Sequence, residues 1–122
     1  MTELVDRVAA GTGLDRAVAE KAVGIILDFL SKEGPADKVG ALIARLPGAE
    51  PLLQTARADD SGDALSGMGG IMGVGSRLMG AGLDMSQIQA TTRELMAFSR
   101  EHGAGDILAD IAAAIPGLSQ FV

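Results

Sequence analysis

The chain has no cysteine, tryptophan or tyrosine, and only one histidine and three phenylalanines among its 122 residues. Without cysteine it can form no disulfide, no thiol nucleophile and no cysteine-ligated zinc site. This composition suits a reducing cytoplasm. With so few aromatic residues, the core must be built from aliphatic side chains and methionine. No charge-free apolar run reaches 18 residues, which disfavours a membrane-spanning helix.

Basic residues are also scarce, with 10 Lys and Arg against 16 Asp and Glu, a net charge of −6. Nucleic acids and anionic membranes both require clustered basic residues, so neither is expected as a partner. Acidic Glu3 and Asp6 stand where a signal peptide would carry Lys or Arg, and we therefore expect a cytoplasmic protein without a leader. At 48% hydrophobic, the chain has enough apolar material for one globular domain over 1–122.

The sequence repeats itself at an offset of 69 residues. Residues 11–53 align with 80–122 without a gap, and ten of the 43 aligned positions are identical, where this composition alone would give roughly four. Most of the identities fall where helices start and stop: Gly11/Gly80, Gly13/Gly82, Leu14/Leu83, Asp15/Asp84, Phe29/Phe98, Gly34/Gly103, Asp37/Asp106, Ala44/Ala113, Pro47/Pro116 and Gly48/Gly117. This distribution predicts an internal duplication of a helical unit.

Helix signals recur within each unit. Asp15 is expected to cap a helix that runs to about Lys32, and Asp84 its counterpart, with Gln87 completing a capping box. Pro35 fits the first position of a shorter helix, and a leading helix is expected over Glu3–Ala10. No stretch alternates with a period of two residues.

The predicted fold is therefore all-α, a compact helical bundle built from two similar helical units around a glycine-rich central helix. The first unit is expected over 1–58, an acidic linker over 59–63, and the second unit over 64–122. The polar stretch 54–63 is the only segment with the composition of a linker. The two units are too small to bury separate cores, so we expect them to pack together.

Residues 67–82 read GMGGIMGVGSRLMGAG. Two phosphate-binding patterns fail there, because Ser76-Arg77 replaces the Lys-Ser of a P-loop and Leu78 replaces the third glycine of a dinucleotide loop. A helix fits better, because its methionines recur on one face and its small residues, spaced by four, would let a second helix approach closely. The candidate interface or ligand-lining residues are Met68, Gly69, Met72, Gly73, Ser76, Met79 and Gly80.

What packs against this helix is left open by the sequence. We expect a buried central helix, because methionine stripes at helical spacing are usually core. A protein partner or a homodimer interface is an alternative, as is a methionine-lined cavity between the units for a small apolar ligand. Membrane contact is less favoured.

No reactive constellation is recognised in the sequence. His102 precedes a helix-ending glycine, with no serine or cysteine nucleophile placed beside it. Asp59, Asp60 and Asp63 do not fit a calcium-binding loop. We therefore expect no catalytic residue, no metal and no cofactor, and a non-enzymatic function through protein–protein contacts.

Two family resemblances follow from specific segments. The segments TELVDRVA, TGL and AEKAV within residues 2–30 resemble the helical dimerisation part of bacterial histone-like HU proteins, which implies a helical packing unit; the basic DNA-binding arms have no counterpart here. The segments GLD, ARLPGAEPLL, MGGIMG and IPGLSQFV resemble small bacterial domains of unknown function of the VcgC/VcgE type, and more distantly YidB-like proteins. That resemblance implies an all-helical fold and no known activity.

Overall fold

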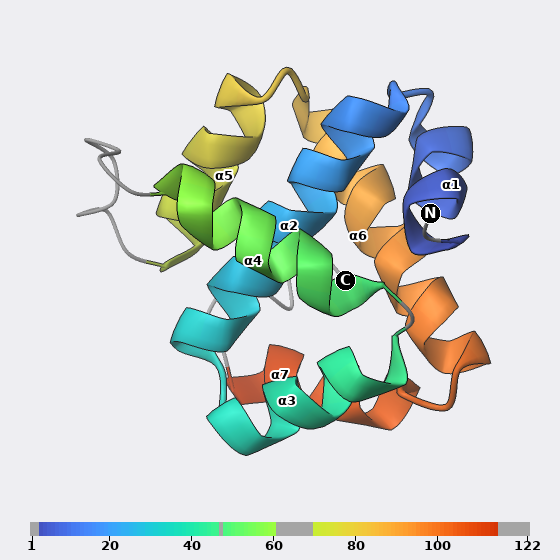
Figure 1. The fold of residues 1–122 in the computed structure, drawn as a ribbon, viewed down its shortest axis with the longest axis vertical. Helices are drawn as coiled ribbons and strands as arrows, with labels where there is room; N and C mark the ends of the chain where they lie inside the picture. The colour runs from blue at the N-terminus through green and yellow to red at the C-terminus, as the bar shows by residue number, and fades with distance from the viewer. Residues whose placement is uncertain (1–2, 47, 61–69, 115–122) are drawn as a thin grey trace.

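The computed structural model describes residues 3–46, 48–60 and 70–114, and the regular structure in these ranges is entirely α-helical. Seven helices are described there (Figure 1): α1 (Glu3–Thr12), α2 (Arg16–Glu33), α3 (Ala36–Arg45), α4 (Ala49–Asp60), α5 (Gly70–Gly80), α6 (Met85–Glu101) and α7 (Gly105–Ala114). The predicted fold class is thus confirmed as all-α. None of the described helices combines the length and the apolar character needed to cross a bilayer.

The helices pack around α2. Helix α4 crosses one side of α2, α5 packs against another part of it, and α6 lies beside it with α1 against α6 (Figure 1). Helices α3 and α7 pack against each other at one end of the molecule. The core is aliphatic, as expected, and Phe29 and Phe98 are its buried aromatic residues within the described ranges.

Among the residues whose burial the structure describes, the longest buried run lies in helix α2. Every residue from 22 to 30 is buried, because this segment, AVGIILDFL, presents apolar side chains on all of its faces. The sequence instead placed the glycine-rich stretch at the centre. That expectation fails for the end of α5, where Met79 and Gly80 are exposed, while residues 67–69 lie outside the described ranges.

Most of the predicted helix ends agree with the structure. Asp84 and Gln87 form the predicted capping box, in which the Gln87 amide N–H donates to Asp84 Oδ1 at 2.8 Å. Asp15 occupies the N-cap position of α2, but its side chain accepts no capping hydrogen bond. Pro35 is the N-cap of α3 rather than its first helical residue, because its ψ of 124° is extended.

Helix α4 overlaps the first two residues of the linker predicted over 59–63. It continues to Asp60, so residues 54–60 are helical, and 61–63 lie outside the described ranges. Pro51 is compatible with this helix because it is the third helical residue, whose N–H would have no partner within the helix. Leu52 and Leu53 are buried, and they fix the apolar side of an otherwise polar helix.

Two glycines near α3 give a paired stability prediction. A Cβ at Gly34 would lie 2.8 Å from the Leu30 carbonyl oxygen and 3.1 Å from Ile111 Cγ2, so Gly34→Ala should lower the free energy of unfolding by about 1–3 kcal/mol. A Cβ at Gly40, inside α3, would meet no atom within 4 Å, so Gly40→Ala should raise it by about 0.5–1 kcal/mol. Urea unfolding followed by circular dichroism measures both, and changes of the same sign would contradict the prediction.

Candidate interaction surface

The structure describes only part of the predicted interface set. Met68 and Gly69 lie outside the described residues. Met72 and Gly73 belong to α5, but their surroundings also fall outside what the structure describes. Ser76, Met79 and Gly80 are described: Ser76 is half-buried, and the other two are exposed.

Among the described glycines of this stretch, the predicted close packing is not found at Gly80. A Cβ added at Gly75 or Gly80 would meet no atom within 4 Å, so no described helix of the same chain approaches α5 there. Close approaches occur instead at glycines outside this stretch. At Gly11 in α1, a Cβ would lie 2.5 Å from Glu94 Oε1 of α6.

A glycine-dependent turn sets the position of Met79. The Leu83 amide donates to the Leu78 carbonyl at 3.2 Å, and the Gly82 amide donates to the Met79 carbonyl at 3.0 Å, which is the Schellman pattern that ends a helix. Gly82 has a φ of +110°, and Leu78 and Leu83 are both buried. With its neighbour Leu78 held in the core, Met79 faces solvent.

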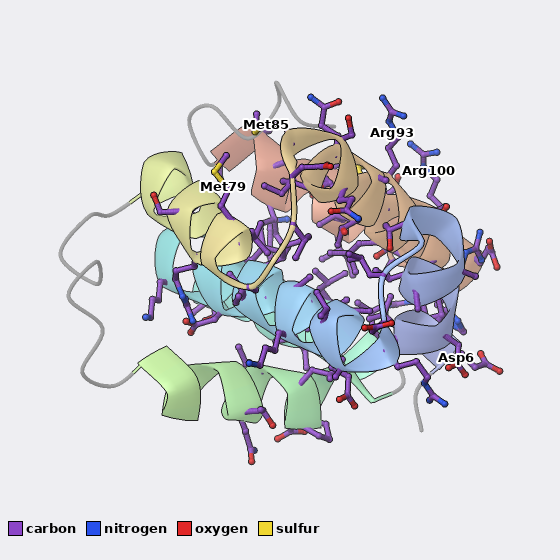
Figure 2. The ribbon with its side chains drawn as sticks, turned by 90° about the horizontal axis from the view of Figure 1, so that it is seen from above. Asp6, Met79, Met85, Arg93 and Arg100 are labelled. Atoms are coloured by element: carbon purple, nitrogen blue, oxygen red, sulfur yellow. The ribbon has the colours of Figure 1, made fainter. Side chains whose placement is uncertain are left out.

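Met79 and Met85 are the two large hydrophobic residues of the described ranges that remain exposed, at 51% and 49%. Figure 2 shows both on the side of the molecule that also carries Arg93 and Arg100. Met85 is exposed because it is the first residue of α6 and lies at the edge of that helix. Both methionine side chains are about half exposed to solvent.

A buried ion pair attaches α5 to α2. Arg77 Nη1 lies 3.0 Å from Asp28 Oδ2, and the two side chains are 13% and 0% exposed. Lys32 Nζ also lies 3.3 Å from the same oxygen. The Asp28–Arg77 pair holds the end of α5 against α2, which fixes the position of Met79 on the surface.

The outer face of α6, which we define as Ser86, Arg93, Met96, Ala97 and Arg100, is the second part of this surface. Ser86, Arg93 and Arg100 are exposed, and they lie on one line of the helix because each is seven residues from the next. Met96 and Ala97 beside them are half-buried. Neither Arg93 nor Arg100 has an ion-pair partner among the described residues.

The acids of α6 face α1 instead. Arg7 Nε donates to Glu94 at 3.3 Å, and Arg7 also pairs with Glu101. The hydrogen bond to Glu101 is the main cause that raises the pKa of Arg7, followed by the one to Glu94. Glu94 and Glu101 are therefore held by α1, and the charge on the outer face of α6 is positive.

Arg93 and Arg100 are not among the residues that the sequence indicates as an interface. The seven-residue spacing of Arg93 and Arg100 places them on one face of a helix, but it does not show whether other helices pack on that face. One signal was available: across the offset of 69, Arg93 and Arg100 align with Gly24 and Ser31, so charged residues stand where the first unit has small ones.

Two further residue groups have structural roles. His102 is the C-cap of α6, and its ring lies 4.2 Å from that of Phe98. Asp110 pairs with Lys38 at 3.0 Å between α7 and α3, and the neighbouring Asp106 is exposed. Within the described ranges, no three His, Asp or Glu side chains are grouped closely enough to hold a metal ion.

Comparison with protein-family models, with curated proteins and with solved structures found no match for this chain.

Proposed function

We propose that the chain is a non-enzymatic helical protein that acts by binding other proteins. The contact would use the side of the molecule that carries Met79, Met85, Arg93 and Arg100. One observation carries the proposal: the two exposed large hydrophobic side chains share this side with two arginines that have no ion-pair partner in the described residues. Exposed apolar side chains beside unpaired arginine are typical of contact surfaces.

Internal duplication is part of this proposal, and the helix bounds support it. Helix α2 begins at Arg16 and α6 at Met85, and α3 begins at Ala36 and α7 at Gly105; each pair differs by 69 residues. The packing also supports it. In the duplication α1 corresponds to α5, α2 to α6 and α3 to α7. The contact of α1 with α6 then corresponds to the contact of α5 with α2, and both contacts occur in the structure.

The non-enzymatic assignment rests on the roles of the charged residues. The ion pairs formed by Asp28, Arg7 and Asp110 each join two helices, as expected for groups that hold a fold together. The resemblance to VcgC/VcgE-type domains, the cytoplasmic location and the absence of a cofactor stay part of the proposal. The alternative of an apolar-ligand carrier gains no support from Met79 or Met85, which face outward.

A second copy of the chain is a candidate partner for the methionines. We expect size-exclusion chromatography with light scattering to give twice the 12.4 kDa of the chain at high protein concentration. The double substitution Met79→Glu and Met85→Glu should return the protein to a monomer with an unchanged circular dichroism spectrum, because both side chains are exposed. Ala41→Glu, on the exposed part of α3, is the matched control and should leave the mass unchanged.

A strict monomer at every concentration would show that the homodimer is wrong. Photo-crosslinking inside cells then tests for other protein partners, with p-benzoylphenylalanine replacing Met79 in one variant and Ala41 in the control. Adducts at Met79 alone agree with the proposal. If neither variant forms an adduct, or both form the same ones, the proposed contact surface is wrong.

A further inference from the structure

The two long helices α2 and α6 differ in what covers them. Helix α4 packs along α2, and Gly24 and Leu27 of α2 are buried. At the corresponding positions of α6, offset by 69 residues, Arg93 is exposed and Met96 is half-buried. In Figure 2, α4 lies on one side of α2 and α6 on the other, and Arg93 and Arg100 point away from the molecule.

No described helix takes the place of α4 on α6. The helices that pack on α6 are α1, α7, α2 and α5, and they cover its inner side. Among the described helices, therefore, none covers the outer face of α6, whereas α4 packs on α2. This comparison rests on the duplication within the proposed function.

The positive charge of the outer face of α6 favours a partner that carries carboxylates. Arg93 and Arg100 lie two helical turns apart, about 10 Å along the axis, and the nearby Glu94 and Glu101 are held by Arg7. In a chain with a net charge of −6, these two cations are uncompensated locally. Guanidinium groups bind carboxylates through paired hydrogen bonds, so the matching groups are two carboxylates with the same spacing.

The space between the arginines favours an α-helix as the partner. Met96 and Ala97 are half-buried beside the line of exposed residues, and they offer a narrow apolar strip to aliphatic side chains. A methionine adapts to different neighbours, and a small alanine lets a second helix approach. Helix α4 illustrates this packing on α2, where its Leu52 and Leu53 are buried.

We propose that the outer face of α6 binds one amphipathic helix of a partner protein, which carries two carboxylates seven residues apart beside aliphatic side chains. A second copy of this chain does not offer that pattern. Glu94 and Glu101 are its only acidic residues seven apart, and both already pair with Arg7. An anionic membrane is disfavoured, because stable attachment takes clusters of four or more basic residues.

A designed peptide tests the proposal directly. The probe is a capped helical peptide of alanine and glutamine with a leucine stripe and two glutamates seven residues apart; its controls carry glutamine or lysine at the two glutamate positions. It is titrated into the isotope-labelled full chain, followed by amide chemical shifts. We expect shifts at Ser86, Arg93, Ala97 and Arg100, and no comparable shifts with the lysine peptide.

Charge variants separate the arginines from the general charge of the protein. Arg93→Gln and Arg100→Gln should each weaken binding of the glutamate peptide by about fivefold. Lys21→Gln removes the same charge from an exposed position on α2 and should leave binding unchanged. Because all three residues are exposed, circular dichroism should show the same fold in every variant.

Several results would overturn the inference: no shifts on α6 at millimolar peptide, equal binding of the glutamate and lysine peptides, or binding unaffected by Arg93→Gln. Binding to vesicles of phosphatidylcholine and phosphatidylglycerol that Arg93→Gln abolishes, without peptide binding, would also overturn it in favour of a membrane. Crosslinks at Met79 without peptide binding to α6 would leave the proposed function standing and remove this inference alone.

Discussion

Replacing Asp28 by alanine is expected to lower the free energy of unfolding by about 3–5 kcal/mol. The Asp28 side chain is fully buried, and Arg77 of α5 lies 3.0 Å away with only 13% of its side chain exposed. Removal of the carboxylate leaves the guanidinium in the interface between α2 and α5 without this counter-charge, and the desolvation of that charge is no longer compensated. Urea unfolding followed by circular dichroism measures the change.

Two further variants identify the cause of that loss. Asp110→Ala breaks the exposed pair with Lys38 and should cost less than about 1 kcal/mol. The double variant Asp28→Leu and Arg77→Met replaces both charges by apolar groups and should recover most of the stability lost in Asp28→Ala. An equal cost for Asp28→Ala and Asp110→Ala would show that burial of the first pair has no energetic consequence.

The second large effect concerns neighbouring residues on α5. Leu78 is 1% exposed and Met79 is 51% exposed. Leu78→Ala should lower the free energy of unfolding by about 2–5 kcal/mol, because it removes buried methyl groups and leaves a cavity in the core. Met79→Ala should change it by less than about 0.5 kcal/mol, so the two substitutions separate the anchor of this helix from its contact residue.

The same pair tests whether α5 belongs to the folded core. If Leu78→Ala were as mild as Met79→Ala, the end of α5 would not be held by the chain itself, and the fixed presentation of Met79 would be wrong. Amide hydrogen exchange gives an independent measurement. In Leu78→Ala, the amides of residues 75–80 should exchange faster than those of α2, because burial of the Leu78 side chain holds this end of α5 in the core.

The parts of the fold that were predictable from sequence are those set by local chemistry. The capping box of Asp84 and Gln87 requires only residues three apart, and the structure has it. Helix α4 was missed because its sequence is polar and begins with a proline-containing turn. Its helical state depends on burial of Leu52 and Leu53, which is a tertiary contact that composition does not reveal.

The candidate surface was predictable only in part, for a related reason. Met79 and Gly80 were named from their spacing, but spacing did not say that this end of α5 faces solvent. Arg93 and Arg100 were not named, because the exposed side of α6 depends on which helices pack against its other sides. The repeat carried this information through Gly24, the residue equivalent to Arg93, and comparison of the two units would have directed attention to α6.

The pairing of helices from distant parts of the chain has a consequence for folding kinetics. Arg7 and Glu94 are 87 residues apart in sequence, and Lys38 and Asp110 are 72 apart. Helical proteins usually fold fast because most of their contacts are local. Here α1 pairs with α6 and α3 pairs with α7, so each pair can form only when a long stretch of chain between its helices is closed into a loop. We therefore expect folding to be slower than in a helical bundle whose packed helices are neighbours in sequence.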